Sequence, residues 1–238
     1  MTMPLFYRRT RAPGPINGVA MPGDVGSIPD MAFWCSADDI SGNDGDAIAT
    51  WYGKTTVTNN LTQTTEAQKP ILKKNIINGH AVARFDGSDD NMVFGTALTA
   101  NPFHLFVVAK YNATGRVIVS GGGGALRVLL GLIAGNNAIS IIKSGAVVLG
   151  TSSNTLNNAS FNLITLYYSN PNYGFRFNGV DAGTGSNAQT MNPATRVSKS
   201  DYGEYWNGDI AELIVFNRAL SGGEFTTVED YLAGKYAL

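Results

Sequence analysis

The chain has 238 residues, enough to bury one sizeable core, and 15% of them are charged while 28 are glycine. This composition favours a loop-rich β protein, because surface helices need charged outer faces. The net charge of −1 provides no field to attract nucleic acid or an anionic membrane, so we expect neither as a partner.

The first 30 residues differ in composition from the rest of the chain. Five of the nine prolines lie there, together with Arg8, Arg9 and Arg11. Proline removes backbone donors and favours extended chain, so we predict an extended arm over 1–30. The arm has no core of its own, and we expect it to dock on a partner protein or a neighbouring subunit of a multi-copy assembly. It also lacks the apolar stretch of a signal peptide.

From Met31 onward, short apolar segments alternate with turns rich in Gly, Asn, Asp and Ser. Strands are predicted at 80–85, 103–109, 116–120, 126–134, 138–143, 146–150, 161–169, 173–179 and 209–216. The alternation in the first of these places Ala81, Ala83 and Phe85 on one face. Turn signals about every 10 residues indicate a two-sheet sandwich or jelly roll. Cys35, the single cysteine, follows a Trp in an apolar run, so we expect a buried thiol and no disulfide.

The end of the chain changes from strand to helix periodicity after Asn217. Ser221 and Glu224 have the spacing of a capping box. The apolar residues that follow share one helical face: Phe225, Val228, Leu232 and Tyr236. We predict one amphipathic helix over 221–236, lying on the sandwich, with Asp230 and Lys235 facing solvent.

Four segments resemble the concanavalin A-like, laminin-G-like jelly-roll domains common in bacterial surface proteins and phage virion proteins. They are MAFWCSADDI (31–40), GDAIATWYG (45–53), GHAVARFDGSDDNMVF (79–94) and the last 32 residues (207–238), which match the family's final strand and closing helix nearly throughout. After Trp51 the family usually continues Asp-x-Ser-Gly, whereas this chain has YGKT. The resemblance implies an all-β, two-sheet antiparallel jelly-roll sandwich over 31–238 that includes the C-terminal helix.

Relatives with this sandwich include glycoside hydrolases, so the acidic residues bear on catalysis. Hydrolysis requires two carboxylates across one sugar, and on a strand they must be an even number of residues apart to share a face. Asp209 and Glu212 are three apart, so we predict that they point to opposite faces. His80 and His104 have no second ligand at metal spacing. We therefore predict no catalytic residue and no enzyme.

The segment DGSDD at 86–90 has two interpretations. Carboxylates and carbonyls of a turn can ligate Ca²⁺, and laminin-G-like domains often hold one near a loop edge, which would use Asp86, Asp89 and Asp90. Alternatively, Asp86 followed by Gly87 and Ser88 is an ordinary turn whose carboxylate accepts from nearby backbone amides. We adopt the turn and expect no cofactor, with Ca²⁺ as the alternative.

Exposed aromatic rings are the remaining indication of function, because their flat faces match the C–H face of a sugar. Trp34 and Trp51 lie in family-like strand segments and are expected in the core. Tyr202 and Tyr205 lie in the polar loop before the last strand, and Tyr173 has a similar setting. We predict that these three tyrosines contact a glycan or a partner; the alternative is that they cover the edge of the sandwich.

Three hypotheses about function follow. The leading one, from the resemblance and the arm, is a non-catalytic virion-associated protein, made in the host cytoplasm. Its arm would dock on other virion proteins while the sandwich serves as decoration or host contact. The second is a carbohydrate-binding module for a bacterial surface polysaccharide. The third is a polysaccharide-degrading enzyme.

Overall fold

The computed structural model describes residues 23–55, 59–99, 101–112, 117–121, 126–130, 138–143, 147–155, 159–190 and 192–238. The first 22 residues of the predicted arm, with Arg8, Arg9 and Arg11, lie outside the described residues.

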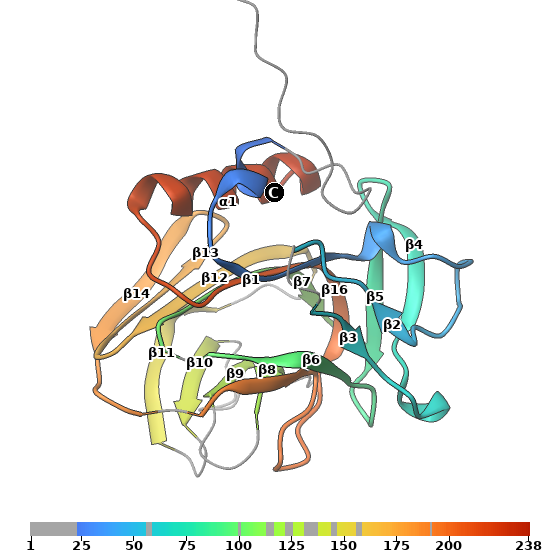
Figure 1. Ribbon diagram of the computed structural model, residues 1–238, viewed down its shortest axis with the longest axis horizontal. Helices are drawn as coiled ribbons and strands as arrows, with labels where there is room; N and C mark the ends of the chain where they lie inside the picture. The colour runs from blue at the N-terminus through green and yellow to red at the C-terminus, as the bar shows by residue number, and fades with distance from the viewer. Residues whose placement is uncertain are drawn as a thin grey trace, which may run out of the picture.

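Two antiparallel sheets face each other, as Figure 1 shows. The first, called the helix-side sheet, contains in spatial order β14 (Val180–Ser186), β13 (Asn172–Phe177), β12 (Asn162–Ser169), β7 (Phe103–Tyr111), β16 (Asn207–Phe216), β5 (His80–Asp86) and β4 (Ile71–Ile77), with β1 (Met31–Ser36) paired to β16. The second sheet contains β11 (Val147–Thr155), β10 (Ala138–Lys143), β9 (Leu126–Leu130), β8 (Val117–Ser120), β15 (Ala194–Val197), β6 (Met92–Leu98), β3 (Leu61–Thr62) and β2 (Thr50–Trp51). The predicted two-sheet sandwich is confirmed.

The main core lies between the sheets. Ala81, Ala83 and Phe85 belong to it, as the alternation in β5 predicts, and the fully buried Trp51 joins them. Cys35 is also buried there without a disulfide. Burial, together with the nearby charge of Glu212, raises the pKa of the Cys35 thiol well above its usual value, so the thiol is kept in its unreactive protonated form.

A second core lies on the outer face of the helix-side sheet. It is covered by helix α1 (Gly222–Tyr236) and by the short 3₁₀ helix η1 (Gly23–Ser27). Val25 and Ile28 are buried there with Val228 and Leu232. The described end of the predicted arm, residues 23–30, therefore packs on the protein's own helix, because its two apolar side chains gain burial there.

The predicted start of helix α1 is confirmed. The Ser221 side chain accepts a hydrogen bond from the Glu224 amide at 3.3 Å, and the Glu224 carboxylate accepts one from the Ser221 amide at 2.8 Å. Arg218 adds a contact of 2.6 Å to the same carboxylate. The bonds from Arg218 and Ser221 lower the pKa of Glu224 to about 2. None of the described helices is long and apolar enough to cross a membrane.

Two predicted side-chain orientations are wrong. Lys235 does not face solvent, because it pairs with Glu212 and Asp38 beneath the helix, whereas Asp230 is exposed as predicted. Asp209 and Glu212 do not point to opposite faces: the register of β16 against β7 shifts between Ile210 and Glu212. This β-bulge adds one residue, so both acids lie on the outer face of the helix-side sheet.

The second sheet and the sheet edges contain most of the strands that the sequence pattern did not predict. They are β2, β3, β4, β6, β14 and β15. Two of them are only two residues long, and β14 has two glycines, an alanine and a serine among its seven residues, so these three strands show no strong apolar alternation.

Candidate functional site

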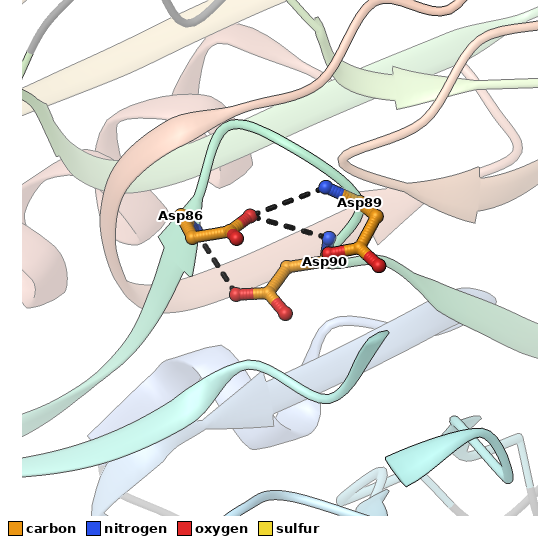
Figure 2. A group of neighbouring side chains, drawn as sticks. All are labelled: Asp86, Asp89 and Asp90. Carbon is orange, nitrogen blue, oxygen red and sulfur yellow. Dashed lines mark hydrogen bonds between the residues drawn. The ribbon is translucent and has the colours of Figure 1, made fainter. Parts of the chain in front are cut away.

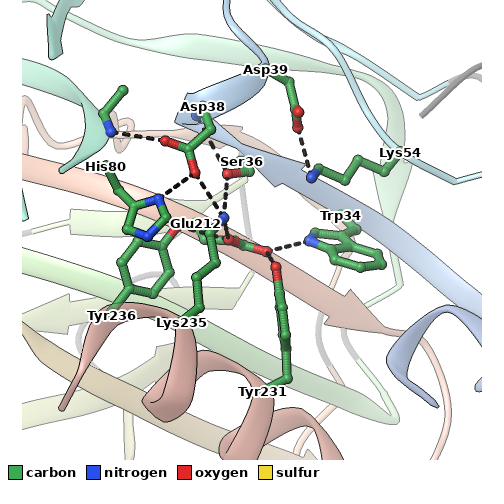
Figure 3. Close-up of polar contacts among 11 residues, drawn as sticks. Trp34, Ser36, Asp38, Asp39, Lys54, His80, Glu212, Tyr231, Lys235 and Tyr236 are labelled. Carbon is green, nitrogen blue, oxygen red and sulfur yellow. Dashed lines mark hydrogen bonds and ion pairs between the residues drawn. The ribbon is translucent and has the colours of Figure 1, made fainter. Parts of the chain in front are cut away.

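The C-terminal half of helix α1 covers a buried carboxylate, that of Glu212 (Figure 3). It accepts hydrogen bonds from Trp34 Nε1 at 2.6 Å, Tyr231 Oη at 2.8 Å, Tyr236 Oη at 2.7 Å and Lys235 Nζ at 2.7 Å. Each oxygen thus accepts two bonds, which uses the acceptor capacity of a carboxylate. We call these five residues the Glu212 cluster.

Further charges surround the Glu212 cluster, as Figure 3 shows. Asp38 contacts Lys235 Nζ at 3.0 Å and His80 Nδ1 at 2.9 Å, and Asp39 pairs with Lys54 at 2.8 Å. Although burial opposes its charge, Glu212 and Asp38 together raise the pKa of Lys235. Three of the donors to Glu212 belong to α1 or its end, so the cluster anchors the helix to the sheet. Because the Glu212 carboxylate already accepts four hydrogen bonds, it has no free acceptor for a ligand.

The turn at 86–90 is built as an aspartate-capped turn (Figure 2). Asp86 Oδ1 accepts from the amides of Ser88 at 2.8 Å, Asp89 at 3.3 Å and Asp90 at 3.4 Å, and Asp90 Oδ2 accepts from the Asp86 amide at 2.9 Å. Gly87 takes a φ of +78°, which a residue with a side chain adopts only at a cost. These bonds support the turn interpretation.

The same three aspartates are the group in the described part of the chain that could hold a metal ion, with ligand oxygens within 4.8 Å of one another. Burial and the charges of Asp86 and Asp89 raise the pKa of the Asp90 carboxyl to about 7. Oxygen ligands of this kind suit Ca²⁺. Since the hydrogen bonds within the turn account for the arrangement without an ion, calcium binding stays a prediction.

The three predicted contact tyrosines do not form one site. Tyr202 and Tyr205 lie in the loop that leads into β16, beside the aspartate turn, because Asn207 pairs with Asp86. Tyr202 is 55% exposed. Tyr173 lies at the opposite end of the helix-side sheet, half-buried against the main core. Its role as a glycan contact stays a prediction, as do those of Tyr202 and Tyr205.

A hollow of about 670 Å³ lies on the outer face of the helix-side sheet, beside the N-terminal half of α1. This volume is within the range of small-molecule sites. Its floor comes from β7, β12, β13 and β14, and its wall from residues 219–226. We call it the outer groove. Sequence reasoning did not predict it.

His104 contributes the most deeply buried polar group of the outer groove. The side chain is 5% exposed, and its Nδ1 has no hydrogen-bond partner among the described residues. Burial and the nearby Arg218 lower the pKa of the imidazole to about 4, so the ring is neutral at pH 7. A buried polar atom without a partner costs free energy, and a hydrogen bond with a bound ligand would recover that cost.

Two aromatic rings flank the imidazole: Tyr167 at 5.5 Å and Phe225 at 6.0 Å between ring centroids. Tyr167 lies over Gly174, where an added Cβ would come within 2.4 Å of the ring. Glycine at this position therefore lets the tyrosine ring lie close to the sheet. The outer groove thus combines apolar ring surface with polar groups.

The charged residues of the outer groove are Arg176 and Asp181. The Arg176 guanidinium binds Glu229 at 3.1 Å and Asp181 at 2.9 Å. Glu229 is buried and also accepts from Thr165 Oγ1 at 2.9 Å. Hence one positive charge faces two negative ones.

Comparison with known protein families identifies the superfamily of the chain. The model of the concanavalin A-like lectin/glucanase superfamily matches residues 105–225, just over half of the chain. The chain belongs to this superfamily. The resemblance predicted from the sequence is thereby confirmed. No curated protein sequence is similar enough to count as a match.

Solved structures share the fold at low sequence identity. An arabinofuranosidase complexed with arabinofuranosyl-α-1,2-xylobiose has a TM-score of 0.62 at 12% identity, covering 80% of this chain and 51% of that one. A Trypanosoma rangeli sialidase in complex with sialic acid has a TM-score of 0.60 at 12% identity, covering 92% and 34%. Domain 4 of AbnA, a GH43 extracellular arabinanase from Geobacillus stearothermophilus, in complex with arabinotriose, has a TM-score of 0.50 at 12% identity, covering 84% and 98%.

The chain spans about half the length of the arabinofuranosidase and about a third of that of the sialidase. In contrast, it covers nearly the whole of the isolated arabinanase domain. At these identities the likeness concerns the fold alone, and function has to be argued from the site.

Proposed function

We propose that this protein is a non-catalytic carbohydrate-binding module whose ligand lies in the outer groove. The observation that carries the proposal is the buried, unpartnered Nδ1 of His104 between the Tyr167 and Phe225 rings. A sugar offers C–H faces for aromatic rings and hydroxyls that either donate or accept hydrogen bonds. The superfamily of lectins and glucanases supports this choice, as does the arabinotriose complex of an isolated domain with this fold.

The distribution of carboxylates favours binding over hydrolysis. Glycoside hydrolysis uses a pair of carboxyl groups across the scissile bond. Among the described residues that line the outer groove, Asp181 is the one carboxylate. The two acids that the bulge in β16 places on one face are engaged elsewhere, Asp209 with Arg84 at 2.7 Å and Glu212 with its cluster. We therefore propose no catalytic role.

A place on a virion, with the sandwich as decoration or host contact, remains the finer prediction. It rests on where domains of this kind occur and on the arm. The docking residues proposed in the arm lie outside the described residues. The proposed carbohydrate binding does not depend on a place on a virion, since the same module can bind its ligand in a viral particle or in another assembly.

The test is a binding measurement with the purified protein and a panel of arabino-, gluco- and uronic-acid oligosaccharides and bacterial polysaccharides, with and without a calcium chelator. Tyr167→Ala should weaken saturable binding about tenfold, because loss of a buried ring contact is worth ~1.5–3 kcal/mol and ~1.4 kcal/mol is tenfold.

Tyr202→Ala is the matched control, since Tyr202 is an exposed tyrosine at the other end of the sheet. If Tyr202→Ala abolishes binding and Tyr167→Ala does not, the site lies at the loop before β16 and the outer groove is wrong. Loss of binding on chelation would instead assign a calcium ion to the turn at 86–90. Absence of binding across the whole panel would overturn the proposed function.

A further inference from the structure

The charges around the outer groove restrict the kind of saccharide that it can hold. Arg176 is the cation on its floor, yet its guanidinium is already bound by two carboxylates and by the Gly179 carbonyl. A carboxylate-bearing sugar would have to displace Asp181 or Glu229 to pair with it. Glu229 is buried and held by Thr165, so its displacement would leave an uncompensated buried charge.

Asp181 faces the outer groove as a mostly unburied carboxylate. Its side chain is 78% exposed, and Oδ1 accepts from Arg176 NH1 at 2.9 Å. An ionised carboxylate only accepts hydrogen bonds. A sugar hydroxyl can donate to the remaining oxygen, whereas the carboxylate of a uronic or sialic acid would be repelled by it.

Two other sources of positive potential lie close to the wall of the outer groove, and both are neutralised. Arg218 forms two bonds with Glu224, at 2.6 and 3.0 Å. The same carboxylate occupies the N-terminus of α1, accepting from the Ser221 amide, where the helix dipole would otherwise favour an anion. The imidazole of His104 carries no charge at neutral pH.

Resting on the proposed function, we infer that the outer groove selects uncharged saccharides over acidic ones. Asp181 accepts from a sugar hydroxyl, His104 supplies the buried hydrogen-bonding partner, and Tyr167 and Phe225 provide the apolar faces. The isolated domain with this fold that is solved with a sugar holds arabinotriose, a neutral saccharide.

The experiment compares dissociation constants for neutral trisaccharides (arabinotriose, maltotriose, cellotriose) with those for trigalacturonate and a sialylated trisaccharide, at low and at moderate salt. We expect the neutral set to include the tightest ligand and every acidic one to bind at least tenfold more weakly. The difference should shrink as salt screens the repulsion.

The matched variants are Asp181→Asn and Asp230→Asn, which remove one exposed carboxylate at the outer groove and one on the far side of α1. Asp181→Asn should reduce the preference for neutral ligands at least threefold, and Asp230→Asn should leave it unchanged.

Failure of this inference and failure of the proposed function give different results. An acidic trisaccharide that binds as tightly as the best neutral one, in a Tyr167-dependent manner, overturns the charge selection and leaves carbohydrate binding intact. Equal effects of the two Asn variants also overturn it. If no saccharide of either set binds, the charge selection and the proposed function are both overturned.

Discussion

Beneath the C-terminal half of α1, the Glu212 carboxylate accepts four hydrogen bonds, whereas beneath the N-terminal half the Nδ1 of His104 has no partner among the described residues. Both side chains lie on the same face of the same sheet and both are buried. They differ in the hydrogen-bond donors around them. Two tyrosine hydroxyls, an indole and a lysine surround Glu212, whereas aromatic rings flank His104.

The difference shows that buried polar side chains serve two purposes in this protein. A fully satisfied cluster holds two elements together in one arrangement, whereas an unsatisfied group costs stability and can still accept a partner. The helix is therefore anchored at its end, and its beginning forms one wall of the outer groove.

The largest expected effect is on the Glu212 cluster. Glu212→Ala should lower the free energy of unfolding by about 3–5 kcal/mol, because it leaves the Lys235 ammonium buried without its main partner. Chemical denaturation measures the change, and Asp230→Ala, on the exposed side of the same helix, is the control. A single-variant loss under 1 kcal/mol would show that the cluster does not anchor the helix.

An opposite pattern is expected at His104. His104→Phe keeps the aromatic contacts with Tyr167 and Phe225 but removes the unpartnered nitrogen. Stability should stay the same or rise by up to about 1 kcal/mol, while saccharide binding falls about tenfold, as expected for a lost hydrogen bond of ~1.4 kcal/mol. Thermal unfolding and calorimetric titration of the same samples measure both. A variant that loses stability and keeps its affinity would reverse the comparison.

A smaller effect concerns the pH dependence of the turn at 86–90. Asp90 has a folded-state pKa raised to about 7, above the ~3.9 of an unfolded chain. Its contribution to stability is therefore fully present below about pH 4 and is lost as pH rises through 7. Asp90→Asn should remove about 1 kcal/mol of this decline, a value reduced for solvent screening. Denaturant titrations at pH 4, 6 and 8 compare the two proteins. Parallel curves would contradict the shift.

The fold could be predicted from the sequence because its signals are local. The capping box at Ser221 and Glu224 and the alternation in β5 depend on neighbouring residues, and both were correct. The placement of Asp209 and Glu212 was wrong because a bulge at Ala211 changes the alternation without changing the composition. Lys235 was misplaced because the buried stripe of α1 is wider than its apolar residues indicate, and a long side chain can bury its stem.

The outer groove could not be predicted in this way. Its residues are brought together by strand pairing: His104 opposes Tyr167 across β7 and β12, and Gly174 of β13 opposes Tyr167 in turn. Phe225 reaches them from the helix, more than a hundred residues after His104. The one local sign of the outer groove was in β12, where alternate residues carry hydroxyl groups. This alternation places Thr165, Tyr167 and Ser169 on one face.

The packing of η1 against α1 has a practical consequence for how the protein is presented to ligands. Val25, near the start of the described chain, lies against the closing helix, and the C-terminus lies close to η1 (Figure 1). A tag or carrier joined after Leu238 thus begins on the face that holds the outer groove. For surface capture or display, spacer length will govern access to the ligand. Attachment through Lys199, which follows β15 of the second sheet, would leave the outer groove turned toward solution.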